Sequence, residues 1–211
     1  MRVLSELEPK NVFSFFEDIC NIPHPSYKEE KISNYLVDFA KERKLEYYQD
    51  SLNNVIIIKE ASKGYEDAAP IILQGHMDMV CEKTPDCDKN IDEDGLDLEV
   101  NGDFISAKGT TLGGDDGIAV AYALAILDDD SIAHPRLEFV CTVSEEVGME
   151  GASSIDVSML KGKKLLNMDS EEEGIMLASC AGGCSSRVTL KLDKNKVTGT
   201  KLSITLQGKR V

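Results

Sequence analysis

The sequence predicts an α/β fold, a mixed β-sheet flanked by helices, and two observations lead to this class. Segments with apolar residues at helical spacing alternate with short continuous apolar runs up to about residue 180, the pattern of strands covered by helices. Several apolar runs are followed directly by acidic residues, and ligand-binding groups in such sheets lie beyond the carboxyl ends of the strands. The length of 211 residues allows a large core and one or two domains.

The charge balance is strongly acidic. The chain has 38 Asp and Glu against 23 Lys and Arg, a formal net charge of −15. Nucleic acids and anionic membrane surfaces attract clusters of Lys and Arg, so neither is expected as a partner. A chain of this composition is suited to holding cations.

A cytoplasmic location is expected. No apolar run approaches the ~18–20 residues of a membrane span. The first eight residues lack the apolar core of a secretory signal and include acids. The six cysteines are scattered without a C-x-x-C pair, and thiols in that compartment stay reduced.

Two amphipathic helices are predicted near the start of the chain. Residues 9–22 carry apolar side chains at helical spacing, and Pro23 and Pro25 end this pattern. Ser26 followed by Glu29 has the spacing of a capping box and predicts a second helix to about residue 44. His24, between the prolines, is expected in the turn that joins the helices.

Strands are predicted over residues 45–48, 55–58 and 70–74. The acidic residues 82–103 invite comparison with a calcium loop. The EF-hand pattern requires Gly at its sixth position and Glu at its twelfth, and neither register that supplies one of them supplies the other. A solvated hairpin is predicted there instead.

The second half of the chain begins with an Ala-rich apolar segment, residues 117–127, which predicts a buried helix. The runs 136–143 and 165–168 predict two strands, each followed by acidic residues. Beyond residue 174 the sequence pattern changes. Alternating apolar and polar residues predict strands over 175–180, 186–192 and 201–206.

His76 and Asp78 follow the apolar run at residues 70–74. On an extended chain, side chains two residues apart point to the same face, so the imidazole and the carboxylate are expected side by side. A carboxylate there can fix the tautomer of a metal-bound histidine. The alternative is a core histidine beside a surface aspartate, and only the acids after other strands argue against it.

Glu145, Glu146 and Asp169 also follow predicted strands, and Asp115 begins a helix nearby. One imidazole with several carboxylates can bind divalent metal ions, and this donor set suits zinc, with manganese or cobalt as substitutes. Adjacent residues at a strand end point to different faces. Glu145 and Glu146 are therefore expected to differ in role, one as a ligand and the other in proton transfer.

Four motifs taken together resemble the M20 family of dinuclear metallopeptidases. They are Gly75-His76-Met77-Asp78, the glycine-rich residues 109–117, Ser144-Glu145-Glu146 and Asn167-Met168-Asp169. The Thr-Leu-Gly-x-Asp-x-Gly form of the second motif is similar to the aminoacyl-histidine dipeptidase branch, also called Xaa-His or cytosolic non-specific dipeptidases. The resemblance covers essentially the whole chain.

The resemblance implies two divalent metal ions and a ligand set for them. His76 binds the first ion, Asp115 bridges both, Asp169 completes the first site and Glu146 binds the second ion. Asp116 is a close rival of Asp115 as the bridge, and helix capping could explain either residue. The alignment of the motif favours Asp115.

The resemblance also implies a reaction. Asp78 orients the metal-binding histidine, and Glu145 is the general base that takes a proton from a metal-activated water. The implied substrate is a small peptide, either an Xaa-His dipeptide or a broader range of dipeptides. A homodimer is implied for full-length members of the family.

Family members are considerably longer than this chain, which affects the expected domains. Residues 1–185 are expected to form the catalytic domain, and residues 186–211 the first strands of an incomplete lid or dimerisation domain. Neither His24 nor His134 matches the histidine that completes the second metal site in the family. Two alternatives therefore stay open: a catalytically inactive, truncated metal-binding or assembly module, and another M20 amidohydrolase or deacylase.

Overall fold

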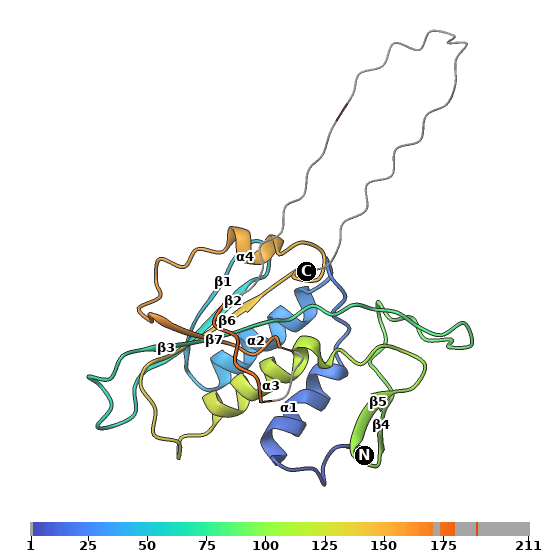
Figure 1. Ribbon diagram of the computed structural model, residues 1–211, viewed down its shortest axis with the longest axis horizontal. Coiled ribbons are helices and arrows are strands. Elements are labelled where there is room, and N and C mark those ends of the chain that lie inside the picture. The colour runs from blue at the N-terminus through green and yellow to red at the C-terminus, as the bar shows by residue number, and fades with distance from the viewer. Residues whose placement is uncertain (1, 171–173, 180–188, 190–211) are drawn as a thin grey trace. The chain divides into compact units, whose positions relative to one another are not determined.

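The computed structural model describes residues 2–170, 174–179 and 189 (Figure 1). The chain divides into two compact units, residues 1–171 and residues 172–211. The first unit contains every helix and strand described below. The domain predicted over residues 186–211 lies outside the described residues, except for Thr189.

A five-stranded mixed sheet forms the centre of the first unit and confirms the predicted α/β class. β3 lies between β6 and β7 and runs parallel to both, whereas β2 pairs antiparallel with β6 and with β1. The carboxyl ends of β3, β6 and β7 therefore lie at the same end of the sheet. The strand order is β1-β2-β6-β3-β7, with bounds β1 Glu46–Gln49, β2 Val55–Lys59, β3 Ile71–His76, β6 Leu137–Thr142 and β7 Lys164–Asn167.

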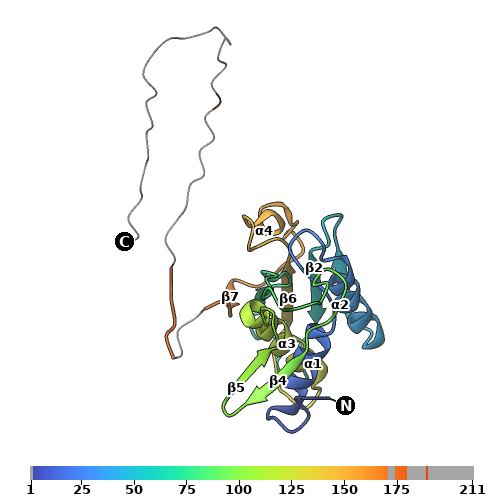
Figure 2. The same cartoon turned by 90° about the vertical axis from the view of Figure 1, so that its right-hand side faces the viewer.

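Helices cover one face of this sheet (Figures 1 and 2). They are α1 (Lys10–Cys20), α2 (Glu30–Glu42) and α3 (Gly114–Asp128). Val55 and Ile57 of β2 pack with these helices in the large core, whereas Ile56 and Ile58 lie in a smaller cluster with residues of the 155–160 segment. Both faces of β2 and β6 are thus buried, as continuous apolar runs predict. No helix in the described part of the chain has the length and apolar character needed to cross a membrane.

The helix predicted after Ser26 is confirmed, but the capping box is wrong. Neither Ser26 nor Glu29 makes a side-chain bond to the start of α2. The Ser26 hydroxyl donates to Asp78 Oδ2 over 2.7 Å, and the Glu29 carboxylate accepts hydrogen bonds from Ser144. Both side chains turn to the end of the sheet, because buried polar groups there need partners.

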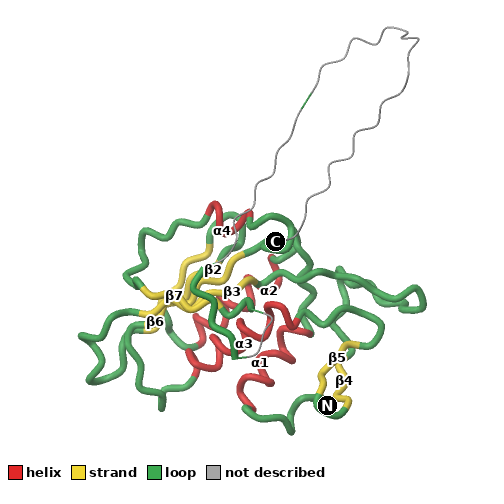
Figure 3. The backbone as a smooth tube through the Cα atoms, viewed as in Figure 1, coloured by secondary structure: helices red, strands yellow, loops and turns green. Residues whose placement is uncertain are grey.

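Three other elements differ from the sequence prediction (Figure 3). A hairpin is present, but β4 (Leu98–Asn101) and β5 (Phe104–Ala107) form it, so it lies partly beyond the acidic residues 82–103. A five-residue helix, α4 (Glu150–Ser154), is too short to give a periodic signal. The strand predicted over 175–180 is wrong for residues 175–179, which are not paired with any strand of the described chain. Their apolar side chains are exposed, and an apolar run forms a strand only where a neighbour accepts its hydrogen bonds.

Gly75 marks a close approach between β3 and the start of α3. A Cβ atom at residue 75 would lie 2.5 Å from Asp116 Oδ2 and 3.3 Å from the Cβ of Ala119. We predict that Gly75→Ala lowers the free energy of unfolding by about 1–3 kcal/mol, the usual cost of overpacking. Urea denaturation measures this change. Gly114→Ala is the control, since its added Cβ would meet only Leu112 at 3.9 Å, and equal losses in the two variants would contradict the prediction.

Candidate metal centre

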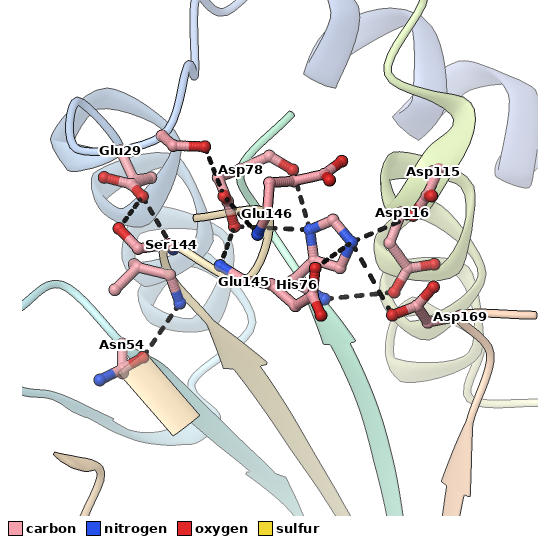
Figure 4. Close-up of polar contacts among 12 residues, drawn as sticks. Glu29, Asn54, His76, Asp78, Asp115, Asp116, Ser144, Glu145, Glu146 and Asp169 are labelled. Atoms are coloured by element: carbon pink, nitrogen blue, oxygen red, sulfur yellow. Dashed lines mark hydrogen bonds and ion pairs between the residues drawn. The ribbon is translucent and has the colours of Figure 1, made fainter. Parts of the chain in front are cut away.

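Three parallel strands deliver the predicted residues to one end of the sheet. His76 is the last residue of β3 and lies opposite Thr142, the last residue of β6. Glu145 and Asp169 follow the ends of β6 and β7 within a few residues. Figure 4 shows the carboxylates of Asp169, Asp115 and Asp116 on one side of the imidazole of His76, with Glu145 on the other.

The outer nitrogen of His76 faces several carboxylate oxygens. Its Nε2 lies 3.0 Å from Asp115 Oδ1, 3.9 Å from Glu145 Oε2 and 4.0 Å from Asp169 Oδ2. The histidine side chain is 1% exposed, whereas that of Asp115 is 58% exposed. The imidazole is therefore held within the protein, and the carboxylate side of the site opens to solvent.

Among the residues that the structure describes, two groups of side chains have the geometry to hold a metal ion. One consists of His76, Asp115 and Glu146, and the other of His76, Glu145 and Asp169, with the ligand atoms of each group within 4.8 Å of one another. All four predicted ligands thus lie in these groups. The second group also contains Glu145, which the family resemblance assigns to proton transfer.

Asp78 contacts the inner nitrogen of His76 in two ways. Nδ1 lies 2.9 Å from the backbone oxygen of Asp78 and 3.4 Å from its Oδ1. The backbone carbonyl is thus the closer partner, although the sequence pointed only to the carboxylate. A proton on Nδ1 leaves the lone pair of Nε2 facing the carboxylate oxygens, which is the form that binds metal.

Asp115 and Asp116 have different surroundings, although either could have been the bridging residue. Both have non-helical backbone dihedral angles at the start of α3, and the peptide bond between them is cis. The Asp115 side chain contacts His76 Nε2. Asp116 is buried, and its Oδ2 accepts a hydrogen bond of 3.2 Å from the backbone N–H of His76. Asp116 therefore supports the end of β3, and Asp115 faces the ligand groups.

The crowding of acids changes the pKa values of the groups at the centre. Burial alone would lower the pKa of His76, but the carboxylates of Asp78, Asp116 and Asp115 outweigh burial and raise this pKa to about 10. Burial raises the pKa of Asp116 to about 7, and the neighbouring acids add to this effect. The pKa values of Glu145 and Glu146 are also raised, first by burial and then by the nearby negative charges. Such a cluster favours a bound positive charge.

Sequence reasoning missed the residues that hold the loop after β6. Glu29 and Asn54 both accept hydrogen bonds from this loop, and Ser26 donates to Asp78. The Ser26-x-x-Glu29 spacing was visible in the sequence, but it has the form of a helix cap. Asn54 gave no signal beyond that of a turn residue.

Solved structures of peptidases share this fold. A tripeptidase from Staphylococcus aureus superimposes with a TM-score of 0.64 at 22% identity, over 77% of this chain and 44% of that one. This match concerns the fold alone. No family model matches the sequence.

Two relatives are considerably more similar. The aminoacylhistidine dipeptidase of Vibrio alginolyticus has 42% identity and a TM-score of 0.79, over 81% of this chain and 35% of that one. The cytosol non-specific dipeptidase of Escherichia coli is 41% identical over 197 residues, which cover 93% of this chain and 41% of the relative. These matches confirm the predicted resemblance to the aminoacyl-histidine dipeptidase branch. The chain spans about two fifths of the length of the curated relative.

The raised pKa of His76 makes the stability of the metal-free protein depend on pH. A histidine in an unfolded chain has a pKa of ~6.5, whereas in the fold this pKa is about 10. The imidazolium therefore stabilises the fold fully below pH ~6.5, and this contribution is lost as the pH rises toward the folded pKa. We predict that the free energy of unfolding of the chelator-treated chain falls between these pH values, as measured by urea denaturation.

His76→Gln serves as the control for this prediction, because the variant lacks the titrating group and should lose most of the slope. The raised pKa of Asp116 also makes the free energy of unfolding fall as the pH rises. This fall ends near the pKa of Asp116 in the folded chain, which is about 7. Stability that stays constant or rises above pH ~7 in the unsubstituted chain would contradict the assignment.

Proposed function

We propose that this chain carries the metal-binding and catalytic part of a dinuclear metal-dependent dipeptidase. The proposal rests on one observation. One imidazole and carboxylates from separate elements form two overlapping groups of possible metal ligands. The Escherichia coli and Vibrio alginolyticus relatives are dipeptidases. Since the chain spans only part of each relative, the activity, a small peptide substrate and a cytoplasmic location all belong to the proposal.

The donor set fits divalent cations. His76, Asp115 and Asp169 would hold one ion, and Asp115 and Glu146 the other. Mixed imidazole and carboxylate ligands favour zinc, with manganese or cobalt as substitutes. The like charges that raise the pKa values of Glu145 and Glu146 are the charges that bound cations would neutralise. Two divalent ions held there would supply an activated water and would polarise the scissile carbonyl.

Glu145 is the group that we assign to proton transfer. Its side chain is 31% exposed and lies at the open side of the centre, 3.9 Å from His76 Nε2. Burial is the largest cause that raises its pKa in the metal-free centre, and a general base is most effective when its pKa lies near the working pH. Glu145 takes the proton of the attacking water and returns it to the leaving amine. Asp78 keeps the imidazole of His76 in position during this transfer.

The ligand group that contains Glu145 supports a second assignment, in which this residue binds metal instead. We predict that Glu145→Gln lowers turnover of Xaa-His dipeptides by about 10²–10⁴-fold, the usual contribution of a general base, and leaves the bound zinc unchanged. Turnover is measured with added zinc or manganese, and zinc content by elemental analysis. Glu150→Gln is the control, because Glu150 is an exposed acid at the start of α4.

Three outcomes separate the hypotheses. Loss of zinc from Glu145→Gln would make Glu145 a ligand, and near-normal turnover would exclude it as the base. An unsubstituted chain that binds two zinc ions without turnover would support an inactive metal-binding module.

A second pair of variants separates Asp115 from Asp116. We predict that Asp115→Asn weakens the binding of both zinc ions, because the residue is proposed to bridge them. Asp116→Ala should keep the zinc stoichiometry and should instead lower stability, since it removes the side-chain oxygen that accepts a hydrogen bond from the end of β3. Isothermal titration with zinc, combined with thermal unfolding, measures both effects. The reverse pattern would make Asp116 the bridge.

A further inference from the structure

We infer that Glu29 is a positioning residue for the loop that presents Glu145 and Glu146. The inference rests on the proposed function for what these two glutamates do. It extends the site to the start of α2, a part of the chain far from the four sequence motifs.

The loop after β6 is held by side chains along its backbone. Four successive N–H groups donate to side-chain oxygens from three separate segments (Figure 4). The bonds are Val143 N–H to Asn54 Oδ1 at 3.0 Å, Ser144 N–H to Glu29 Oε1 at 2.9 Å, Glu145 N–H to Asp78 Oδ1 at 3.0 Å and Glu146 N–H to Asp78 Oδ2 at 3.4 Å. The path of the chain through residues 143–146 is thus set from outside the loop.

Ser144 is the residue at which this path turns. Its φ is +53°, a left-handed conformation that residues other than glycine rarely adopt and that persists only where the surroundings hold it. Glu29 Oε1 accepts the Ser144 N–H at 2.9 Å and the Ser144 hydroxyl at 2.8 Å. Both side chains are buried, and hydrogen bonds to an ionised acceptor are stronger than those to a neutral one.

The conformation of Ser144 decides where the next two side chains go. Glu145 reaches His76 Nε2 at 3.9 Å, and Glu146 joins the ligand group of His76 and Asp115. Asp78 accepts the N–H groups of these two residues, and Glu29 accepts that of Ser144, which constrains the turn before them. Glu29 supplies that constraint from a fixed position, since its own backbone carbonyl accepts the Ser33 N–H in the first turn of α2.

Groups that orient metal ligands have a measurable effect, typically about 10- to 100-fold in metal affinity. Removing the Glu29 carboxylate should therefore weaken zinc binding even though Glu29 belongs to neither ligand group. A residue that only stabilises the fold would lower the melting temperature and leave the zinc affinity of the folded protein unchanged. This difference makes the inference testable.

The experiment compares Glu29→Ala, Glu29→Gln and the control Glu30→Ala in the full 211-residue chain. Glu30 is the adjacent residue of the same type and is exposed. Titration with zinc chloride should show about 10- to 100-fold weaker binding for Glu29→Ala. Glu29→Gln keeps an oxygen that can accept both Ser144 bonds, so its affinity should lie between those of Glu29→Ala and the unsubstituted chain. Glu30→Ala should match the unsubstituted chain.

Unchanged zinc affinity in a folded Glu29→Ala variant would overturn the inference. If that variant does not fold, Ser144→Ala replaces it, because it removes the hydroxyl bond and keeps the amide bond; unchanged affinity there would again overturn the inference. If the unsubstituted chain binds no zinc, the proposed function fails instead. Amide hydrogen exchange of residues 144–146 then decides the matter: faster exchange in Glu29→Ala supports the positioning role, and unchanged exchange refutes it.

Discussion

The buried carboxylate of Asp78 is the contact on which the site depends, because it contacts two of the three strand ends that carry predicted ligands. It accepts the N–H groups of Glu145 and Glu146 beyond β6 and lies 3.4 Å from Nδ1 of His76 at the end of β3. Burial opposes its ionisation, but the hydrogen bonds from His76, Glu145 and Ser26 outweigh burial and lower the pKa of Asp78. A charged group in the interior is stable only with such partners. Its ionised form therefore joins β3, β6 and the turn before α2 into one unit.

The same logic of charge applies on the open side of the centre. Acids from α3, from the loop after β6 and from the segment after β7 approach a single imidazole. Their mutual repulsion is relieved by a positive charge, either a proton on His76 or bound cations. Without a bound cation, the repulsion between these acids lowers the stability of the fold. Cations that bind relieve the repulsion and raise the stability, which links binding to folding.

Sequence patterns predicted most of the fold because the strongest signals are local. The continuous apolar runs of β2, β3 and β6 and the periodic spacing in α1 and α2 follow from burial of one or both faces. The failures occurred where a local pattern had two explanations. Ser26 and Glu29 fit a capping box by spacing, yet both bond to groups more than fifty residues away in the chain. The apolar residues 175–177 suggested a strand, but strand formation requires a partner that spacing cannot reveal.

The sequence by itself determined which residues could form the centre. His76 and the acids that follow the strands were identified from residue type and from their place after apolar runs, since the carboxyl ends of parallel strands meet at one end of a sheet. Only the tertiary structure decided how Asp115 and Asp116 differ and which side chains hold the loop at residues 143–146. Those contacts join segments that are distant in the chain, and their geometry depends on how the helices and the sheet pack together. The local sequence around each residue does not specify that packing.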